Sequence, residues 1–252
     1  MDLRLAGKRA VVTAASKGIG REIALGLAAE GAAVAICARG EADLRKAEAA
    51  LRTDGVPVFA DVCDVGQPGA IETFLDAARD ALGGIDILVN NATGYGFSDQ
   101  PEAWRASLDV DLMAAVRACW KVVPWMTDAG GGAIVHISSI AGLYANPNPA
   151  YAAAKAAVIS HSKSLAIELA PSRIRANVVC PGSIFLPDGL WDQVRRRDPA
   201  RFEAIVATIP SGRMGHPQEV ADAVVYLCSD RASWITGACR DTGRRRRRGT
   251  RR

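Results

Sequence analysis

The segment AVVTAASKGIG, residues 10–20, indicates the fold class most directly. Its first half is a short apolar run rich in valine and alanine. Its second half, Thr13–Gly20, is a glycine-bearing turn that leads directly into an amphipathic segment. Such a turn between a strand and a helix exposes backbone N–H groups and the positive end of the helix. The stretch therefore predicts a site for a pyrophosphate at the start of an alternating strand–helix chain.

Short apolar runs and amphipathic segments alternate along the rest of the chain. The runs are apolar on both faces, which is typical of strands in a covered parallel sheet. We expect such strands at Ala10–Ala15, Ala33–Ala38, Val56–Ala60, Ile85–Asn90, Ala133–Ser138 and Ile174–Cys180. Helices are expected at Ile19–Glu30, Glu41–Arg52, Pro68–Leu82, Pro101–Met126 and Pro149–Leu169, several with proline in the first turn. This alternation predicts an α/β fold, a doubly wound (Rossmann) parallel sheet with helices on both faces.

The composition fits one domain of this class. The chain has 252 residues, of which 49% are hydrophobic, so a single core needs no disulfide or metal to stabilise it. The six cysteines are far apart in the sequence, and the three histidines (His136, His161 and His216) lie on unrelated segments, so no disulfide framework or metal site is predicted. Neither a signal peptide nor an apolar run of about 20 residues is visible. We therefore expect a cytoplasmic protein.

The net charge of +4 comes from the C-terminal end alone. Residues 244–252, RRRRRGTRR, hold seven arginines, and without them 24 basic side chains stand against 27 acidic ones. The body of the chain is therefore mildly acidic, and its charge does not predict binding to nucleic acid. A run of five arginines repels itself and has nothing apolar to bury. Residues 240–252 are thus expected to form a disordered tail outside the domain at residues 1–239.

Five motifs and their spacing point to a family. The chain carries TAASKGIG (13–20), NNAT (90–93), ISSIAG (137–142), YAAAK (151–155) and NVVCPG (177–182) in this order. Over about residues 5–238 it resembles the short-chain dehydrogenases/reductases of the compact single-domain type, such as the 3-oxoacyl carrier-protein reductases. The resemblance implies an enzyme that interconverts a ketone and a secondary alcohol by hydride transfer with a nicotinamide dinucleotide.

The end of the second strand indicates which dinucleotide binds. A carboxylate there would bind the ribose 2′-hydroxyl of NAD, but the strand ends in Cys37-Ala38-Arg39, and Lys17 adds a second cation in the glycine turn. Two cations that converge on one anion suit the 2′-phosphate of NADP, whereas solvated surface charges are the other interpretation. We expect NADP, with NAD as the alternative. By resemblance, the cofactor contacts are Thr13, Ser16, Lys17, Gly18, Ile19, Gly20, Arg39, Asp61, Val62, Asn91, Ala92, Tyr151, Lys155, Pro181, Gly182 and Ile184.

Tyr151 and Lys155 are four residues apart, so they project from the same face of a helix. A tyrosine hydroxyl is a poor base at neutral pH, and a nearby ammonium group favours the phenolate. By resemblance, Tyr151 exchanges a proton with the substrate oxygen, and Lys155 also binds the ribose hydroxyls of the cofactor. Ser139 is expected to donate a hydrogen bond to the developing oxyanion. Ser138 is then expected to be a strand-end hydrogen-bonding residue.

The chain departs from the family pattern at four positions. Asp111 stands where relatives have the fourth catalytic residue, an asparagine that helps to hold a water against the lysine. A carboxylate can still accept a hydrogen bond from water or lysine, and its charge would keep Lys155 protonated while opposing the phenolate beside it. Leu186 replaces a threonine that contacts the carboxamide, and Ala14 and Thr93 occupy glycine positions.

Residues 183–215 interrupt the alternation after the sixth strand. This stretch mixes aromatic and aliphatic residues with the charged run Arg195–Asp198. A helical excursion here would lie over the carboxyl ends of the strands, where open α/β sheets bind ligands. The stretch is therefore either a substrate lid or a surface helix pair with buried aromatic residues. We expect the substrate to contact Ser139, Tyr151, Leu186 and Trp191.

Two other functions remain open. Arg195–Arg197 could meet an acidic carrier, as expected for a 3-oxoacyl carrier-protein reductase, although such a run is more often a solvated helix face. The substitutions at Asp111 and Leu186 are also compatible with a catalytically weak NADP-binding sensor or scaffold. The intact catalytic serine, tyrosine and lysine favour the enzyme.

The C-terminal end loses the family pattern abruptly. The segment Ile235–Cys239 is followed by Arg240 and arginine-rich sequence, where relatives have a short final strand. A change of reading frame or a genuine basic tail would produce such a break, and we expect the former. The seventh strand is then expected to be missing or degraded, which would leave the sixth strand as an edge. By resemblance the protein is a homo-oligomer, and this loss should weaken a tetramer while a dimer through the long helices survives.

Overall fold

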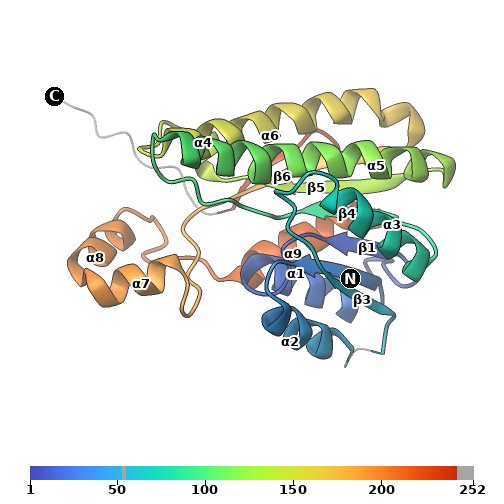
Figure 1. Cartoon of the computed structure of the whole chain (residues 1–252), viewed down its shortest axis with the longest axis horizontal. Coiled ribbons are helices and arrows are strands. Elements are labelled where there is room, and N and C mark those ends of the chain that lie inside the picture. Colours follow the sequence, from blue (N-terminus) through green and yellow to red (C-terminus); the bar gives the residue numbers. More distant parts are fainter. Residues whose placement is uncertain (53–54, 243–252) are drawn as a thin grey trace.

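The computed structural model describes residues 1–52 and 55–242 (Figure 1). In this part of the chain a seven-stranded sheet has the order β3-β2-β1-β4-β5-β6-β7, and all neighbouring strands are parallel. The strands are β1 (Arg9–Val12), β2 (Ala33–Ala38), β3 (Val58–Val62), β4 (Ile87–Asn90), β5 (Gly132–Ile137), β6 (Ile174–Pro181) and β7 (Cys239–Thr242). The doubly wound α/β fold is confirmed. The order reverses between β1 and β4, so ligands are expected outside the carboxyl ends of these two strands.

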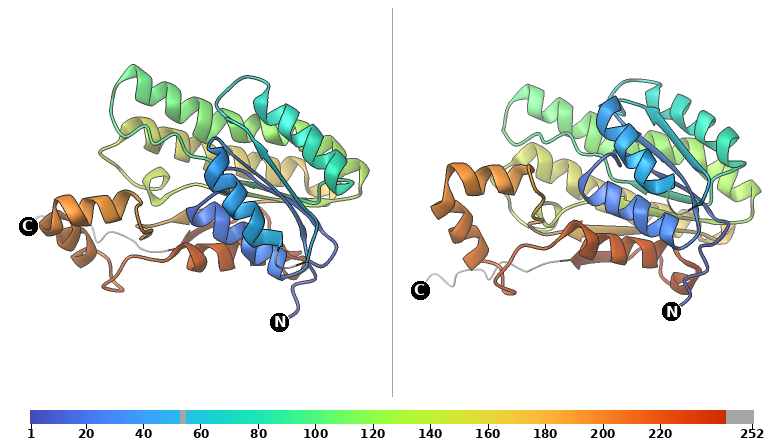
Figure 2. Two further views of the ribbon diagram at one scale, coloured as in Figure 1. Left: turned by 60° about the horizontal axis from the view of Figure 1, so that its bottom comes forward. Right: turned by 90° about the horizontal axis from the view of Figure 1, so that it is seen from below.

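Helices cover both faces of the sheet (Figure 2). One layer holds α1 (Gly18–Ala29), α2 (Glu41–Leu51) and α9 (Pro217–Cys228). The other holds α3 (Ala70–Leu82), α5 (Ala114–Asp128) and α6 (Pro149–Glu168). Short 3-10 turns lie at η3 (Ile140–Gly142), η4 (Ala170–Ser172) and η5 (Asp230–Ala232). No helix of the described residues is long and apolar enough to cross a membrane.

Each face of the sheet has its own core because successive side chains of a strand point to opposite faces. Val12 pairs with Ile36 and Val89, and all three pack against α1 and α9. The preceding residue, Val11, pairs with Ala35, and both pack on the side of α3 and α5. The strands are therefore buried on both faces, as their apolar runs predict.

One of the expected helices has three parts. The segment expected as a helix at Pro101–Met126 consists of α4 (Pro101–Ala106), a π-helical turn η2 (Ser107–Met113) and α5. π-Helical turns are rare and often mark functional sites. This one carries Asp111, and it makes contact with α6 along the side that carries Lys155.

The stretch that interrupts the alternation forms a helix pair, α7 (Leu190–Arg197) and α8 (Pro199–Ala207). The pair projects beyond the sheet, on the side where β6 ends (Figures 1 and 2). Asp192 is buried within this unit and accepts hydrogen bonds from Arg195 and Arg196. Both expected arrangements, a lid and a surface helix pair, are compatible with this position.

Two expectations about the C-terminal part are corrected. The seventh strand is present: Cys239–Thr242 pairs with Val178–Pro181 of β6, so Arg240–Thr242 belong to the sheet. The backbone N–H groups of β6 and of Gly182, which follows it, need hydrogen-bond acceptors, and the residues of β7 supply some of them. Thr242 O, for example, accepts from Gly182 N at 3.2 Å. The expected disordered tail otherwise lies outside the described residues. Helix α9 is absent from the expected elements, although its first-turn Pro217 and Glu219 are helix-start signals.

Candidate active site

The glycine turn after β1 is held by the end of β4. The side-chain amide of Asn91 donates to the carbonyls of Thr13 and Ala14 at 3.0 and 3.1 Å, and its backbone N–H donates to Thr13 Oγ1 at 2.9 Å. A Cβ at Gly20 would collide with that amide and with the Ala14 carbonyl, so only glycine fits there. Gly18 has φ +62°, in the left-handed region that favours glycine. Asn91, expected beside the ribose, thus uses its amide to shape the turn.

The first turn of α1 can accept an anion. Lys17 is the N-cap, its side chain makes no capping hydrogen bond, and the turn contains no acidic residue. Helix N-termini of this kind bind phosphate through free N–H groups and the helix dipole. Leu186 lies over the turn, because its Cδ2 is 3.3 Å from the position of a Cβ at Gly18. The turn at Thr13–Gly20 therefore fits the pyrophosphate of a dinucleotide, and Leu186 lies on that side.

The ends of β2 and β3 form the expected adenosine edge. Arg39 follows β2, whose last residue Ala38 pairs with Val62 of β3. The side chains of Arg39 and Lys17 are exposed, and neither forms an ion pair with a described residue. A hollow of about 440 Å³ beside Asp61 and Val62 opens toward the start of α3. Among the described residues, Lys17 and Arg39 therefore have no acidic partner at the carboxyl ends of the neighbouring strands β1 and β2.

The two serines after β5 have different partners. Ser138 is buried and its hydroxyl donates to the carbonyl of Lys155 at 2.8 Å, so it ties the strand end to α6 as expected. Ser139 is half-buried and is the N-cap of η3, where its Oγ accepts from Ala141 N at 3.1 Å. A Cβ at Gly142 would collide with the backbone at Lys155, so this glycine lets the serine loop pack directly on α6. Ser139 therefore keeps its hydroxyl proton for another acceptor.

Lys155 lies in the middle of the site. Its Nζ forms an ion pair with Asp111 Oδ1 at 2.9 Å, donates to the carbonyl of Ile137 at 3.0 Å, and lies 5.7 Å from the centre of the Tyr151 ring. Lys155 and Asp111 are both buried. Burial opposes the positive charge, but the Asp111 carboxylate and the neighbouring Tyr151 outweigh it and raise the pKa of Lys155. The ammonium is therefore charged at neutral pH.

Asp111 also fixes the loop after β4. Its Oδ2 accepts from Gly94 N at 2.9 Å while its Oδ1 faces Lys155. The expected group of Ser139, Tyr151, Lys155 and Asp111 thus lies on η3, α6 and η2, which pack on one another. The Asp111 carboxylate thus contacts Lys155 directly. The sequence alone allowed either water or lysine as its partner.

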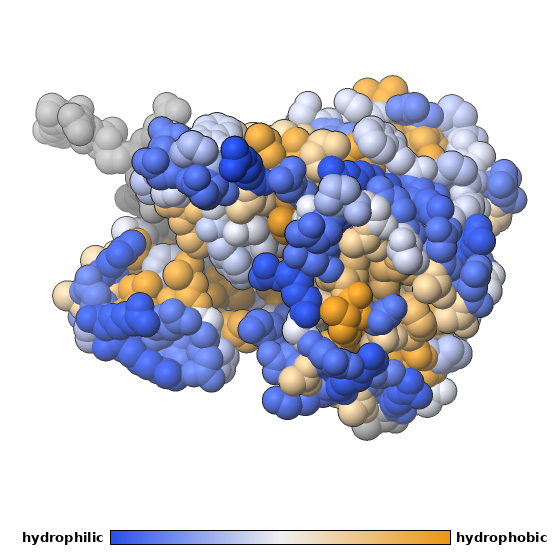
Figure 3. Space-filling model, in the orientation of Figure 1, coloured by the Kyte–Doolittle hydropathy of each residue, from blue (hydrophilic) through white to orange (hydrophobic). Residues whose placement is uncertain are grey.

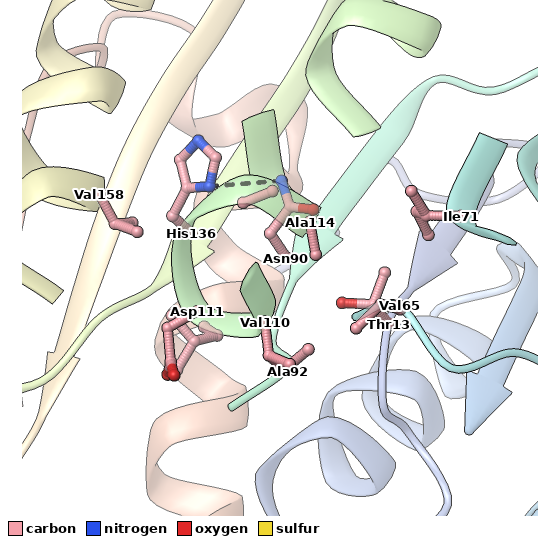
Figure 4. A pocket seen from close by; sticks show the side chains of 12 residues that line it. Thr13, Val65, Ile71, Asn90, Ala92, Val110, Asp111, Ala114, His136 and Val158 are labelled. Atoms are coloured by element: carbon pink, nitrogen blue, oxygen red, sulfur yellow. Dashed lines mark hydrogen bonds between the residues drawn. The ribbon is translucent and has the colours of Figure 1, made fainter. Parts of the chain in front are cut away.

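A cavity of about 10 Å³ lies behind Asp111, between β4, β5 and η2 (Figure 4). A volume of this size admits a single water molecule. Asn90 and His136 point toward each other at its edge, and Asn90 Nδ2 donates to His136 Nδ1 at 3.3 Å. Burial, with the nearby His161 and Lys155, lowers the pKa of His136 to about 3. His136 is therefore a neutral core residue.

The end of β6 completes the cofactor side. Pro181 ends the strand, Gly182 follows it, and Ile184 forms a parallel bridge with Gly215. Trp191 lies on α7, half-buried. Apart from Tyr151 and Lys155 on α6, the expected cofactor residues therefore lie at the carboxyl ends of five strands or in the turns and loops that follow them. They are Thr13, Ser16, Lys17, Gly18, Ile19, Gly20, Arg39, Asp61, Val62, Asn91, Ala92, Pro181, Gly182 and Ile184.

Sequence reasoning missed two aromatic residues. Phe97 stacks edge-on against Tyr151, with ring centres 5.3 Å apart, and Tyr95 stacks edge-on against Phe97 at 5.5 Å. The signal was available: two glycines, Gly94 and Gly96, alternate with two aromatic residues in the loop that follows the NNAT motif. Glycines at such spacing indicate a loop that lies close against its neighbours.

Comparisons with known proteins find relatives over most of the chain. The chain matches the family model described as enoyl-(acyl carrier protein) reductase over residues 13–241. It is 40% identical over 239 residues to dehydrogenase/reductase SDR family member 4 of Bos taurus, covering 92% of this chain and 85% of the relative. It is 39% identical over 236 residues to 3-oxoacyl-[acyl-carrier-protein] reductase FabG of Escherichia coli (strain K12), covering 92% and 93%. L-sorbose reductase from Gluconobacter frateurii, crystallised with NADPH and L-sorbose, has a TM-score of 0.88 and 35% identity, covering 96% and 97%.

Proposed function

This chain belongs to the short-chain dehydrogenase/reductase family, and we propose that it is an NADP-dependent enzyme that interconverts a ketone and a secondary alcohol. One observation carries the proposal. The buried ammonium of Lys155 is held by Asp111 beside the ring of Tyr151, and Ser139 lies on the adjoining turn at the same sheet edge. This arrangement brings a proton donor, a fixed positive charge and a hydrogen-bond donor to one place.

The residues present divide the chemistry between them. When bound, the nicotinamide supplies a hydride to the carbonyl carbon in reduction and accepts it in oxidation. The Tyr151 hydroxyl donates the balancing proton to the carbonyl oxygen and takes it back in the reverse direction. Ser139 donates a hydrogen bond to the same oxygen, because its own oxygen already accepts from Ala141. One hydride and one proton thus convert the ketone to the alcohol.

Lys155 supports the proton transfer through its fixed positive charge. Its Nζ donates one hydrogen bond to the carbonyl of Ile137 and forms an ion pair with Asp111. Its remaining donor capacity can serve the ribose hydroxyls of the cofactor, and the charge stabilises the Tyr151 phenolate once the proton has left. Asp111 compensates the buried charge of Lys155, so it acts as a positioning residue.

The preference for NADP rests on Arg39 and Lys17. Both cations are exposed at the carboxyl ends of β1 and β2, and the residue directly after β2 is Arg39 instead of an acid that would bind a ribose 2′-hydroxyl. A 2′-phosphate would be held by charge-assisted hydrogen bonds from both. We place the enzyme in the cytoplasm, where its six free cysteines would stay reduced.

A 3-oxoacyl carrier-protein reductase is the second candidate. The 39% identity to FabG favours it, but the arginine run on α7 does not. Arg195 and Arg196 are engaged with the buried Asp192 at 2.7 and 2.6 Å, so much of their charge is neutralised within the helix pair. An acidic carrier would have to compete with Asp192 for these two side chains.

The test is a panel of ketones with NADPH and with NADH, followed by the absorbance of the reduced nicotinamide. We expect turnover of ketones with NADPH, and its loss in Tyr151→Phe with nearly unchanged cofactor affinity, because only the proton donor is removed. Turnover that survives in Tyr151→Phe would overturn the mechanism. Binding of NADPH without turnover of any ketone would favour the sensor or scaffold instead.

A further inference from the structure

The backbone of the loop Gly94–Phe97 packs closely against α4 and η2. A Cβ at Gly94 would collide with the carbonyl of Ala106, and a Cβ at Gly96 would collide with that of Ala103. The N–H of Gly94 is bound by Asp111. The loop between β4 and α4 is therefore fixed at both glycines, and it is anchored to the same carboxylate that holds the catalytic lysine.

This anchoring turns the two aromatic side chains outward. Tyr95 has φ +53°, a left-handed conformation that a tyrosine rarely adopts, and Phe97 N donates to Tyr95 O at 2.8 Å across Gly96. Tyr95 is 61% exposed and Phe97 is 36% exposed. A strained backbone that presents apolar rings to solvent is more typical of a binding site than of a packed loop.

Phe97 lies directly beside the proton donor. Its ring is edge-on to Tyr151, at 5.3 Å and 83°, and Tyr95 extends the row at 5.5 Å and 77°. Phe97 is therefore placed to contact a carbon substituent of a substrate whose carbonyl oxygen bonds to the Tyr151 hydroxyl. Aromatic rings prefer other rings in edge-on or offset arrangements at such distances.

The neighbouring loops add apolar surface to the same side. Leu143 and Tyr144 follow the serine turn η3, Leu190 begins α7, and all three are exposed. Figure 3 shows the molecule hollowed between the α7–α8 pair and the sheet body, with apolar residues along the hollow. On α7, Arg195 forms an ion pair with Asp192, and Arg196 forms ion pairs with Asp188 and Asp192. The surroundings thus suit an uncharged, apolar substituent.

We propose that Tyr95 and Phe97 form an aromatic wall that selects the substrate, and that the substrate is a ketone with a flat, unsaturated ring next to its carbonyl carbon. The inference rests on the proposed function, and it names the substrate class of that site. A flat aromatic ring gains the edge-on or offset interaction with Phe97 that a saturated ring of the same size lacks, and a polyhydroxylated chain would lose hydration against the Phe97 ring.

The experiment compares acetophenone with 1-cyclohexylethanone and with L-sorbose, each reduced with NADPH. We expect kcat/KM for acetophenone to exceed that for the cyclohexyl ketone by at least tenfold, mainly through KM, and no measurable reduction of L-sorbose. Phe97→Leu should bring the ratio of the two ketones to about one, whatever happens to the absolute rate. Tyr226→Leu removes an exposed aromatic residue on α9, outside this loop, and should keep the wild-type ratio.

The outcomes separate the two proposals. If the wild type reduces both ketones equally well, or if Phe97→Leu keeps the preference, the aromatic wall is wrong and the proposed function stands. If the wild type reduces none of these three compounds but turns over another ketone of the panel, the aromatic wall is wrong and the proposed function stands; if it turns over no ketone of the panel, both fail. Crystallisation of Phe97→Leu or its melting temperature would show that the variant is folded.

Discussion

Lys155 and Asp111 form an ion pair in which both side chains are almost fully buried, at 3% and 0% exposure. If one of the two charges is removed, the other stays buried without an opposite charge beside it. Burial alone lowers the pKa of a lysine. The carboxylate also anchors the loop at Gly94. A single residue thus sets the charge of the catalytic lysine and the position of the aromatic loop.

In Asp111→Asn the amide oxygen still accepts one hydrogen bond, from Lys155 or from Gly94. We expect kcat/KM at pH 7 to equal or exceed that of the wild type, because the charge that opposes the Tyr151 phenolate is gone. The alkaline limit of activity should move to lower pH, since Lys155 loses its proton earlier. A pH–rate profile measures both, with Asp109→Asn, exposed in the same π-helical turn, as the control. A loss of more than tenfold, about 1.4 kcal/mol, would show that the carboxylate itself is needed.

Arg39 decides the dinucleotide in our proposal. Arg39→Asp replaces attraction for a 2′-phosphate by repulsion, and a charge-assisted contact typically contributes about 1.5–3 kcal/mol. The ratio of the dissociation constants of NADPH and NADH should therefore shift by at least tenfold toward NADH. Titration of the protein fluorescence with each cofactor measures the ratio. Lys46→Asp makes the same change of charge on the outer side of α2 and should leave it unchanged. Equal affinity of the wild type for both cofactors would contradict the assignment.

His136 makes the stability depend on pH. Its pKa in the folded protein is about 3, whereas that of an ordinary histidine is about 6.5. Between these values only the unfolded chain takes up the proton, so the free energy of unfolding falls as the pH falls, by up to about 1.4 kcal/mol per unit. In His136→Asn the decrease between pH 6.5 and 4 should be shallower by this amount, as measured by urea unfolding. Val135→Ala, a core change on the same strand, should keep the wild-type slope, and parallel curves for His136→Asn would refute the prediction.

At the scale of elements, β7 supports the cofactor side of the site. It pairs with β6 from Val178 to Pro181, and Thr242 O accepts from the N–H of Gly182. Cys239 packs beside Cys180, with the sulfur atoms 3.3 Å apart. The four residues therefore cover the edge of β6 just where it leads into the cofactor loop.

Two truncated chains test this role. A chain that ends at Thr242 keeps β7, and we expect wild-type melting temperature and turnover. A chain that ends at Ala238 loses several backbone hydrogen bonds at about 0.5–1.5 kcal/mol each, so its melting temperature should fall by about 5–10 °C. Its affinity for the cofactor should also fall, because Gly182 loses its partner. Thermal unfolding followed by circular dichroism measures the first effect, and equal melting temperatures for the two chains would contradict the role of β7.

At the scale of the whole molecule, the single chain exposes large apolar side chains on its helical layers. Trp120 on α5 is 68% exposed and Ile167 on α6 is 82% exposed, while Trp234 beside η5 is 98% exposed. Side chains of this kind often mark contacts with another protein surface. We propose that copies of this chain associate through these surfaces, and the presence of β7 removes the reason to expect a weakened tetramer.

Light scattering coupled to size-exclusion chromatography tests the association. We expect the wild type to have the mass of a dimer or tetramer, and Trp120→Glu with Ile167→Glu to shift it to a smaller species, because two buried charges would oppose the contact. Turnover per chain measured alongside shows whether the site depends on the partner. A monomeric wild type at micromolar concentration would rule out the homo-oligomer.

Most of the helices and strands and the class of the site could be predicted from the sequence. The runs around Val11 and Ile36 predict strands buried on both faces because their periodicity is a local property of the chain. The glycine turn and the spacing from Tyr151 to Lys155 predict a phosphate turn and a shared helix face for the same reason. The sequence missed α9 and expected no β7, because both are fixed by what they pack against: α1 for the helix and the edge of β6 for the strand.

The contacts between particular side chains became visible in the folded structure. The direct ion pair of Lys155 with Asp111, the contact of Phe97 with Tyr151 and the bond from Ser138 to the backbone of α6 join segments far apart in the chain. No local pattern specifies such contacts, since they depend on how the π-helical turn and the glycine-anchored loop pack on α6. The reaction class could thus be predicted from the sequence, whereas the direct contact of Asp111 with Lys155 and the position of Phe97 beside Tyr151 arise from packing.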